Sequence, residues 1–154
     1  MNLSARLRNK KGFTLIELLV VIGILAVLLA ITLIAINPGR QFAQANNTKR
    51  ASDVNTILNA INQYMADNAG AVPTAITTTD QEINSGGADI CSILVPTYIA
   101  QLPTDPSLTS IVGCPASPDT YASGYNVVKT AEGRITVSAP STEVPATSDI
   151  SVTR

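Results

Sequence analysis

Glu17 is the residue whose surroundings most call for a chemical explanation. It is the one charged residue among residues 13–36, which are otherwise almost wholly apolar. An ionised side chain at the centre of a bilayer costs about 2.5–3.5 kcal/mol on insertion scales, so such a group either reaches the interface or meets a cation. Glu17 lies about one helical turn inside the stretch. Both interpretations, a carboxylate that reaches the interface and one that pairs with a cation, stay open from residue type alone.

Two cysteines, Cys91 and Cys114, lie beyond the apolar stretch. In a domain exported to an oxidising space, such a pair predicts a disulfide. The alternative is two separate buried thiols. Their spacing matches no metal motif, and the sequence contains no histidine to complete a zinc site.

The sequence offers no constellation for catalysis. It lacks a histidine base and a Gly-rich phosphate loop, and its Ser and Thr residues are too scattered to single out a nucleophile. Two Phe, four Tyr and no Trp argue against an aromatic-walled pocket. We expect no enzyme activity, no cofactor and no metal.

Charge is distributed unevenly along the chain. Four of the ten basic residues precede Gly12, and no acidic residue does. Basic residues stay on the cytoplasmic side of a membrane, so this leader sends the opposite end outward. Without residues 1–12, six basic and eleven acidic residues remain, a formal charge of −5. An acidic surface of this kind argues against a direct nucleic-acid site.

The apolar stretch has the length of a transmembrane helix. Residues 18–36 contain no charge, and a helix over residues 13–36 is roughly 36 Å long, enough to cross a bilayer core of about 30 Å. A secretory signal has a shorter apolar region followed by a small-x-small site. No such site closes this stretch before Asn37-Pro38-Gly39, so we expect it to stay with the protein.

The junction Lys10-Lys11-Gly12-Phe13-Thr14-Leu15-Ile16-Glu17 resembles the leader-peptidase site of type IV prepilins and pseudopilins, the class III signal peptide. Residues 18–26 are similar to the same family. The resemblance implies cleavage after Gly12 by a membrane aspartyl protease that also N-methylates Phe13. Gly12 lacks a Cβ, which lets a protease approach an extended backbone closely. The resemblance also implies that Glu17 pairs with the N-terminal amine of a neighbouring subunit.

The same resemblance implies the partners and the location. The partners are further copies of this chain and other pilins in a filament, the prepilin peptidase/N-methyltransferase, an inner-membrane assembly platform, and membrane lipid before assembly. The chain would cross the inner membrane once with its C-terminal domain outside the cytoplasm. It would then enter a cell-surface pilus or a periplasmic pseudopilus.

Four segments follow from the pattern: a cleaved basic leader (1–12), a membrane-spanning and filament-core helix (13–36), an amphipathic helix (37–69) and a disulfide-containing β domain (70–154). Pro38 and Gly39 predict a kink or local melt, the alternative being a linker. Helical pattern resumes at about Arg40 and continues to Asn68. One apolar face of this helix is predicted to cover a sheet. That face comprises Val54, Ile57, Leu58, Ile61, Tyr64 and Met65.

The expected fold class is α+β, with the long N-terminal helix packed on a small antiparallel sheet as in pilins. Residues 90–94 read as a short helix or strand, and three β-prone runs at 125–129, 134–138 and 150–153 predict about three strands. Asp105 and Asp119 resemble oxygen ligands of a pseudopilin calcium loop, whereas the simpler interpretation is turn residues that cap local backbone.

The leading functional prediction is a structural subunit of a type IV pilus, serving adhesion, motility or DNA uptake. A pseudopilin of a type II secretion or competence system is the alternative within the family. From another class, a membrane-anchored binding module that never polymerises also fits the composition. A disulfide-closed loop favours a pilus exposed outside the cell.

Overall fold

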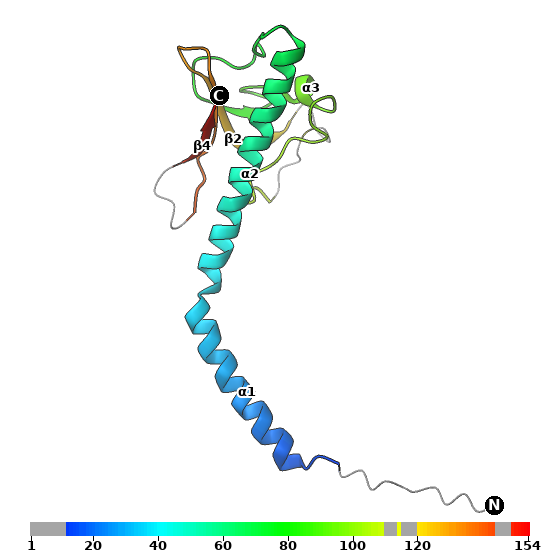
Figure 1. Ribbon diagram of the computed structural model, residues 1–154, viewed down its shortest axis with the longest axis vertical. Helices are drawn as coiled ribbons and strands as arrows, with labels where there is room; N and C mark the ends of the chain where they lie inside the picture. The colour runs from blue at the N-terminus through cyan, green and yellow to red at the C-terminus, as the bar shows by residue number, and fades with distance from the viewer. Residues whose placement is uncertain (1–11, 110–113, 115–119, 144–148) are drawn as a thin grey trace, which may run out of the picture. The chain divides into compact units, whose positions relative to one another are not determined.

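The computed structural model describes residues 12–109, 114, 120–143 and 149–154. The chain forms two compact units, Met1–Pro38 and Gly39–Arg154. Along the chain (Figure 1) the elements are α1 (Leu15–Ile36), α2 (Pro38–Asp67), β1 (Gln81–Asn84), α3 (Cys91–Leu94), β2 (Ala122–Lys129), β3 (Ile135–Ala139) and β4 (Ile150–Thr153). This confirms the predicted α+β, pilin-like layout.

Within its described residues, the first unit contains one complete helix, α1. Its 22 residues include no buried side chain. Among the described residues, α1 is the one helix long and apolar enough to cross a membrane. At 1.5 Å per residue it is roughly 33 Å long. An apolar helix that the chain itself leaves uncovered requires a non-aqueous environment or other copies of itself.

The interruption between the two helices falls at Asn37. Asn37 has a left-handed backbone with φ 48°, and it caps α1. Pro38 is the first residue of α2, where its missing N–H is no loss because the first helical N–H groups have no intrahelical acceptor. Gly39 lies in the same first turn, so α2 begins two residues before the predicted Arg40.

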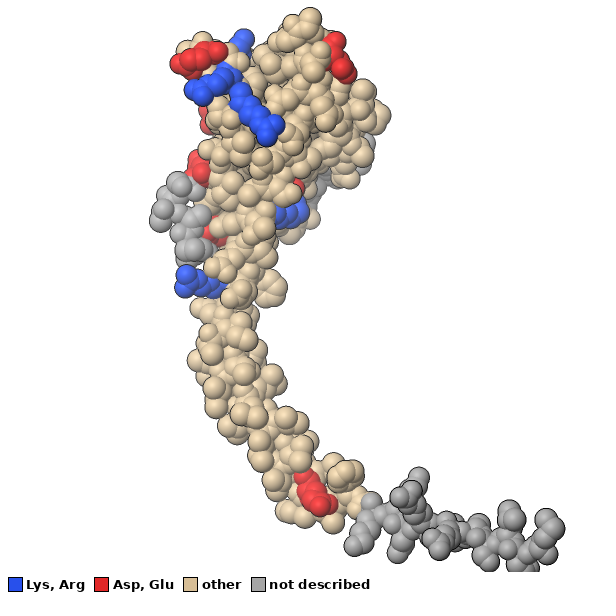
Figure 2. Space-filling view, viewed as in Figure 1, with Lys and Arg blue, Asp and Glu red and all other residues tan. Residues whose placement is uncertain are grey.

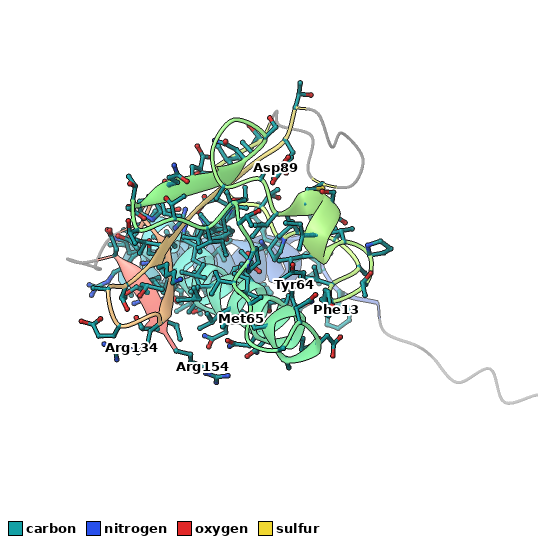
Figure 3. The ribbon with its side chains drawn as sticks, turned by 90° about the horizontal axis from the view of Figure 1, so that it is seen from above. Phe13, Tyr64, Met65, Asp89, Arg134 and Arg154 are labelled. Carbon is teal, nitrogen blue, oxygen red and sulfur yellow. A yellow bond between two sulfur atoms is a disulfide. The ribbon has the colours of Figure 1, made fainter. Side chains whose placement is uncertain are left out.

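The second unit is built on one face of α2. The predicted stripe faces inward: Val54, Ile57, Leu58 and Ile61 are buried, and Tyr64 and Met65 pack partly buried against the same core. Figure 3 shows these last two side chains on α2, where the ring of Tyr64 meets that of Tyr98 edge to face at 5.8 Å between centroids. The core is completed by inward-facing residues of the sheet, such as Tyr125, Val127 and Val137.

In the part of the chain that the structure describes, the sheet has four antiparallel strands in the order β1-β2-β3-β4, one more than predicted. The missed strand is β1, whose sequence Gln-Glu-Ile-Asn has one apolar residue and therefore too little alternation to be recognised. It forms because it pairs with β2, with Glu82 opposite Asn126, and because Ile83 is buried in the core. Tertiary pairing outweighs weak local preference here.

The predicted disulfide between Cys91 and Cys114 is confirmed, with their Cα atoms 5.9 Å apart. Closing a loop of this length stabilises a small domain by about 3 kcal/mol. The Tyr121 hydroxyl lies beside the bridge, where it accepts hydrogen bonds from the N–H groups of Ile90 and Cys91 and donates to Asp89. Burial raises the pKa of the Tyr121 phenol, which keeps this donor protonated.

Candidate functional site

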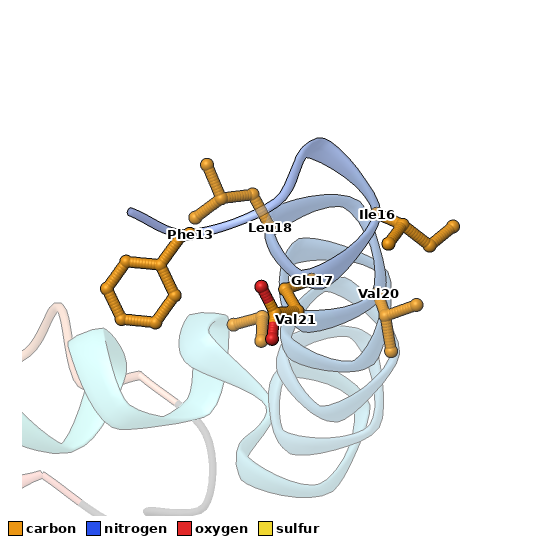
Figure 4. A pocket seen from close by; sticks show the side chains of 6 residues that line it. All are labelled: Phe13, Ile16, Glu17, Leu18, Val20 and Val21. Carbon is orange, nitrogen blue, oxygen red and sulfur yellow. The ribbon is translucent and has the colours of Figure 1, made fainter. Parts of the chain in front are cut away.

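The start of α1 carries a hollow with one polar group in it. Six residues line this open hollow of about 590 Å³: Phe13, Ile16, Glu17, Leu18, Val20 and Val21. In Figure 4 the Glu17 carboxylate lies beside Val21, on the side of the helix toward which the Phe13 ring extends. The hollow therefore presents a carboxylate within an apolar surround.

Thr14 holds the Glu17 carboxylate against the helix start. The backbone N–H and the hydroxyl of Thr14 both donate to Glu17 Oε2, each at 2.7 Å. The Glu17 N–H donates in return to Thr14 Oγ1 at 3.3 Å. This reciprocal capping box satisfies donors that the first helical turn would leave unpaired. In a single chain, one oxygen of Glu17 is thus already occupied.

The second carboxylate oxygen is free to meet another group. Among the described residues, Glu17 Oε1 accepts no hydrogen bond in the chain, whereas Oε2 accepts two. Glu17 is the one charged residue of α1, and the rest of the helix surface visible in Figure 2 is uncharged. An incoming cation therefore meets one acidic side chain along the whole helix.

Gly12 and Phe13 precede α1 in an open segment. A side chain built at Gly12 would meet nothing within 4 Å, and the Phe13 side chain is 85% exposed. The structure brings Phe13 and Glu17 to one hollow. Pro38 and Gly39 begin α2, while Cys91 and Cys114 belong to the second unit. The leader residues 1–11 lie outside the described residues.

Comparison with known families bears directly on this site. Residues 7–33 match a family model described as a prokaryotic N-terminal methylation motif. The chain carries this methylation motif. It is the class III signal peptide of type IV pilins and pseudopilins, and it spans Gly12, Phe13, Thr14, Glu17 and most of α1. No curated protein and no solved structure matches the chain.

Thr14 also belongs to the methylation motif, but no role was predicted for it from the sequence. A signal for it was present, because Thr-x-x-Glu ahead of an apolar run is the sequence form of a capping box. What the sequence left open was whether Glu17 turns back to Thr14 or away from it. The hydrogen bonds to Oε2 decide that question for the single chain.

Replacing Thr14 by Val should loosen the first turn of α1. The substitution removes the hydroxyl that serves as both donor and acceptor, and losing such a cap costs about 1 kcal/mol. We expect the amides of the first turn to exchange with solvent about fivefold faster in the full chain in micelles, measured by NMR. Thr14→Ser keeps the hydroxyl and should exchange like the unaltered chain. Equal exchange in Thr14→Val would show that the cap does not hold the turn.

A second polar cluster lies inside the Gly39–Arg154 unit. Arg50 of α2 is 0% exposed, and its guanidinium binds both oxygens of Asp105 at 2.7 and 3.0 Å. The same group donates to Glu143 at 3.1 Å and to Asn47 at 3.0 Å. The arrangement is a closed ion-pair network that fixes two distant segments onto α2.

This network answers the calcium hypothesis for Asp105. Both carboxylate oxygens accept from Arg50, and one of them also accepts from the N–H of Ser107, so the side chain is fully engaged. The Arg50 guanidinium already contacts both Asp105 oxygens, which a calcium ion would need as ligands. Asp119, the other candidate ligand, lies outside the described residues. Among those that are described, no three potential ligands cluster.

The Asp105 carboxylate should make stability depend on acid pH. Burial by itself would raise its pKa, but hydrogen bonds from Arg50 and Ser107 outweigh that effect and hold the pKa below its usual range. A carboxyl group with a lowered pKa stabilises the folded chain above its unfolded pKa of about 3.9. That contribution is lost as the pH falls through the folded-state pKa.

We therefore expect the free energy of unfolding to fall below about pH 4. Urea unfolding of the full chain in micelles at stepped pH measures this. Asp105→Asn should be less stable at neutral pH and should lose less on acidification. Parallel curves for the two chains would show that Asp105 is not responsible.

Proposed function

We propose that this chain is a structural subunit of a type IV pilus, made as a precursor, cleaved after Gly12, methylated on Phe13 and polymerised through α1. The observation that carries the proposal is the methylation motif at residues 7–33, placed on a helix whose apolar surface the chain leaves uncovered. A structural subunit needs no catalytic site. The pilin-type motif favours this class over an enzyme.

The exposed apolar surface of α1 fits two successive environments, the lipid bilayer before assembly and the filament afterwards. Lipid surrounds the helix before assembly, since its 22 residues match the thickness of a bilayer core of about 30 Å. Other α1 helices replace lipid in the filament. Both environments bury the apolar surface, whereas water would not.

Glu17 supplies the register for this exchange. Cleavage creates a charged amine on Phe13, and methylation leaves that amine charged. Thr14 occupies Oε2 of Glu17, while no described residue donates to Oε1, which can receive the amine of a second copy. Pairing two ions inside an apolar bundle satisfies both, and it sets the axial position of each new subunit.

The Cys91–Cys114 bridge favours a pilus over a periplasmic pseudopilus, because a covalently closed loop suits a subunit exposed outside the cell. Adhesion, motility and DNA uptake are the activities such a filament serves. Loss of surface filaments on deleting the chain, seen by electron microscopy, is the expected result. Surface filaments that persist while type II secretion or competence fails would assign the chain to a pseudopilus.

The mass of the N-terminal peptide from membranes and filaments tests the processing step. We expect a chain that begins with methylated Phe13. A mature chain that retains Met1, and that stays monomeric after detergent extraction, would instead identify a membrane-anchored module that does not polymerise. Gly12→Leu should block cleavage, while replacement of the helical Gly23 by Ala should not. Cleavage of both variants would show that the protease does not require Gly12 for recognition.

A further inference from the structure

The Thr14 hydroxyl makes one hydrogen bond more than a helix cap requires. A capping box consists of two bonds between side chain and backbone, which here are Glu17 N–H to Thr14 Oγ1 and Thr14 N–H to Glu17 Oε2. The hydroxyl also donates to Glu17 Oε2 at 2.7 Å. This third bond joins the two side chains and satisfies no backbone group. The stability of the helix start therefore does not explain it.

The third bond places a second donor on one oxygen of the carboxylate. The N–H and the hydroxyl of Thr14 both lie 2.7 Å from Glu17 Oε2. A Glu side chain has several rotatable torsions, and its terminal torsion is broad, so one hydrogen bond leaves the carboxylate able to turn. A second donor at a different position restricts that turning. The hydroxyl thus orders a group that the backbone N–H alone would hold loosely.

The surroundings of Glu17 offer nothing else to hold its carboxylate. Among the described residues, the hydrogen bonds to this side chain come from Thr14 alone. The other residues that line the hollow have apolar side chains (Figure 4): Phe13, Ile16, Leu18, Val20 and Val21. A charged group in apolar surroundings depends strongly on each hydrogen bond it receives. The hydroxyl of Thr14 is therefore the one side-chain group that can direct the carboxylate.

We infer that Thr14 is a positioning residue for assembly, whose hydroxyl fixes the Glu17 carboxylate so that Oε1 is presented to the amine of a second copy. The inference rests on the proposed pairing of Glu17 with that amine, and it adds the group that orients the pair. Because the carboxylate is already ordered in the single chain, less side-chain freedom is lost when the pair forms. Losing one hydrogen bond to a charged group should weaken the pairing by about tenfold.

Substitutions at Thr14 can separate this role from that of the helix cap. Gly is accepted at an N-cap almost as well as Thr, so Thr14→Gly removes the hydroxyl and largely keeps the helix start. Thr14→Ser restores the hydroxyl. Thr32→Val is the matched control, because Thr32 also lies on α1 but its hydroxyl donates to the Leu29 carbonyl at 2.9 Å. The readout is sheared filament relative to membrane-bound chain whose N-terminal mass shows methylated Phe13.

Thr14→Gly should give about tenfold less filament, whereas Thr14→Ser and Thr32→Val should match the unaltered chain. Full filament yield from Thr14→Gly would overturn the inference, because the cap alone would then be sufficient. A loss in Thr14→Ser or in Thr32→Val as large as that in Thr14→Gly would overturn it too, since the effect would not follow the hydroxyl beside Glu17.

The same measurement on Glu17→Ala distinguishes this inference from the proposed function. Filaments that need Glu17 but not the Thr14 hydroxyl would overturn the positioning role and leave the pairing intact. Normal filaments from a correctly processed Glu17→Ala chain would overturn the pairing itself, and the positioning role with it.

Discussion

Replacing Glu17 by Ala is expected to give a chain that is cleaved and inserted into the membrane but that assembles into filament about a hundredfold less, or worse. In the proposed filament, the substitution would leave the amine of a second copy without its counter-charge inside an apolar bundle. Removing one partner of a buried ion pair costs about 3–5 kcal/mol, and each 1.4 kcal/mol is a factor of ten in affinity. Filament sheared from cells and quantified against membrane-bound chain measures the effect.

Glu132→Gln provides a matched control. It also removes one carboxylate, but from an exposed turn between β2 and β3. We expect normal filaments from this variant. The N-terminal mass of Glu17→Ala must show methylated Phe13, so that an assembly defect is separated from a processing defect. Normal filament yield from a correctly processed Glu17→Ala chain would rule out the pairing model.

Replacing Arg50 by Met is expected to lower the free energy of unfolding by about 3–5 kcal/mol. Arg50 is fully buried and holds Asp105 through two hydrogen bonds and Glu143 through one. Without the guanidinium, the Asp105 carboxylate stays buried with no cation. Urea unfolding of the full chain in micelles, followed by near-ultraviolet circular dichroism of the tyrosines, measures the loss.

Lys49→Met is the control. It tests whether the loss of stability in Arg50→Met comes from the burial of that ion pair, or whether removing any ion pair on α2 would cause it. Lys49 bonds Asp53 at 2.7 Å, but its side chain is 50% exposed. Exposed pairs contribute about 0–1 kcal/mol, so a small change is expected. Adding Asp105→Asn to Arg50→Met should recover part of the lost stability, because the uncompensated charge is gone. Equal losses for Arg50→Met and Lys49→Met would show that the buried network does not hold the domain.

The N-terminal features could be predicted because their causes are local. A run of apolar residues specifies a helix of membrane length without reference to the rest of the chain, and the order Gly12, Phe13, Glu17 is a linear motif. The inward face of α2 followed from helical periodicity, since Val54, Ile57 and Ile61 recur at the spacing of one face. Predicting the disulfide needed only the number of cysteines and the expectation that the domain is exported to an oxidising space.

Other features depended on contacts between segments far apart in the sequence. Arg50 reads as a solvent-facing residue in a helical pattern, because its burial requires Asp105 and Glu143, respectively 55 and 93 residues later. Strand β1 has little propensity of its own and forms against β2. Asp105 looked like a turn residue or a metal ligand until its partner was placed.

The sequence by itself determined the membrane-length helix, its leader junction and its one acidic group, since each is a property of neighbouring residues. Only the tertiary structure decided which oxygen of Glu17 is taken by Thr14 and which charge neutralises Asp105. Hydrogen-bond geometry and burial depend on where the backbone places groups in space. The order of residues along the chain does not by itself show which distant groups, such as Arg50 and Asp105, come together.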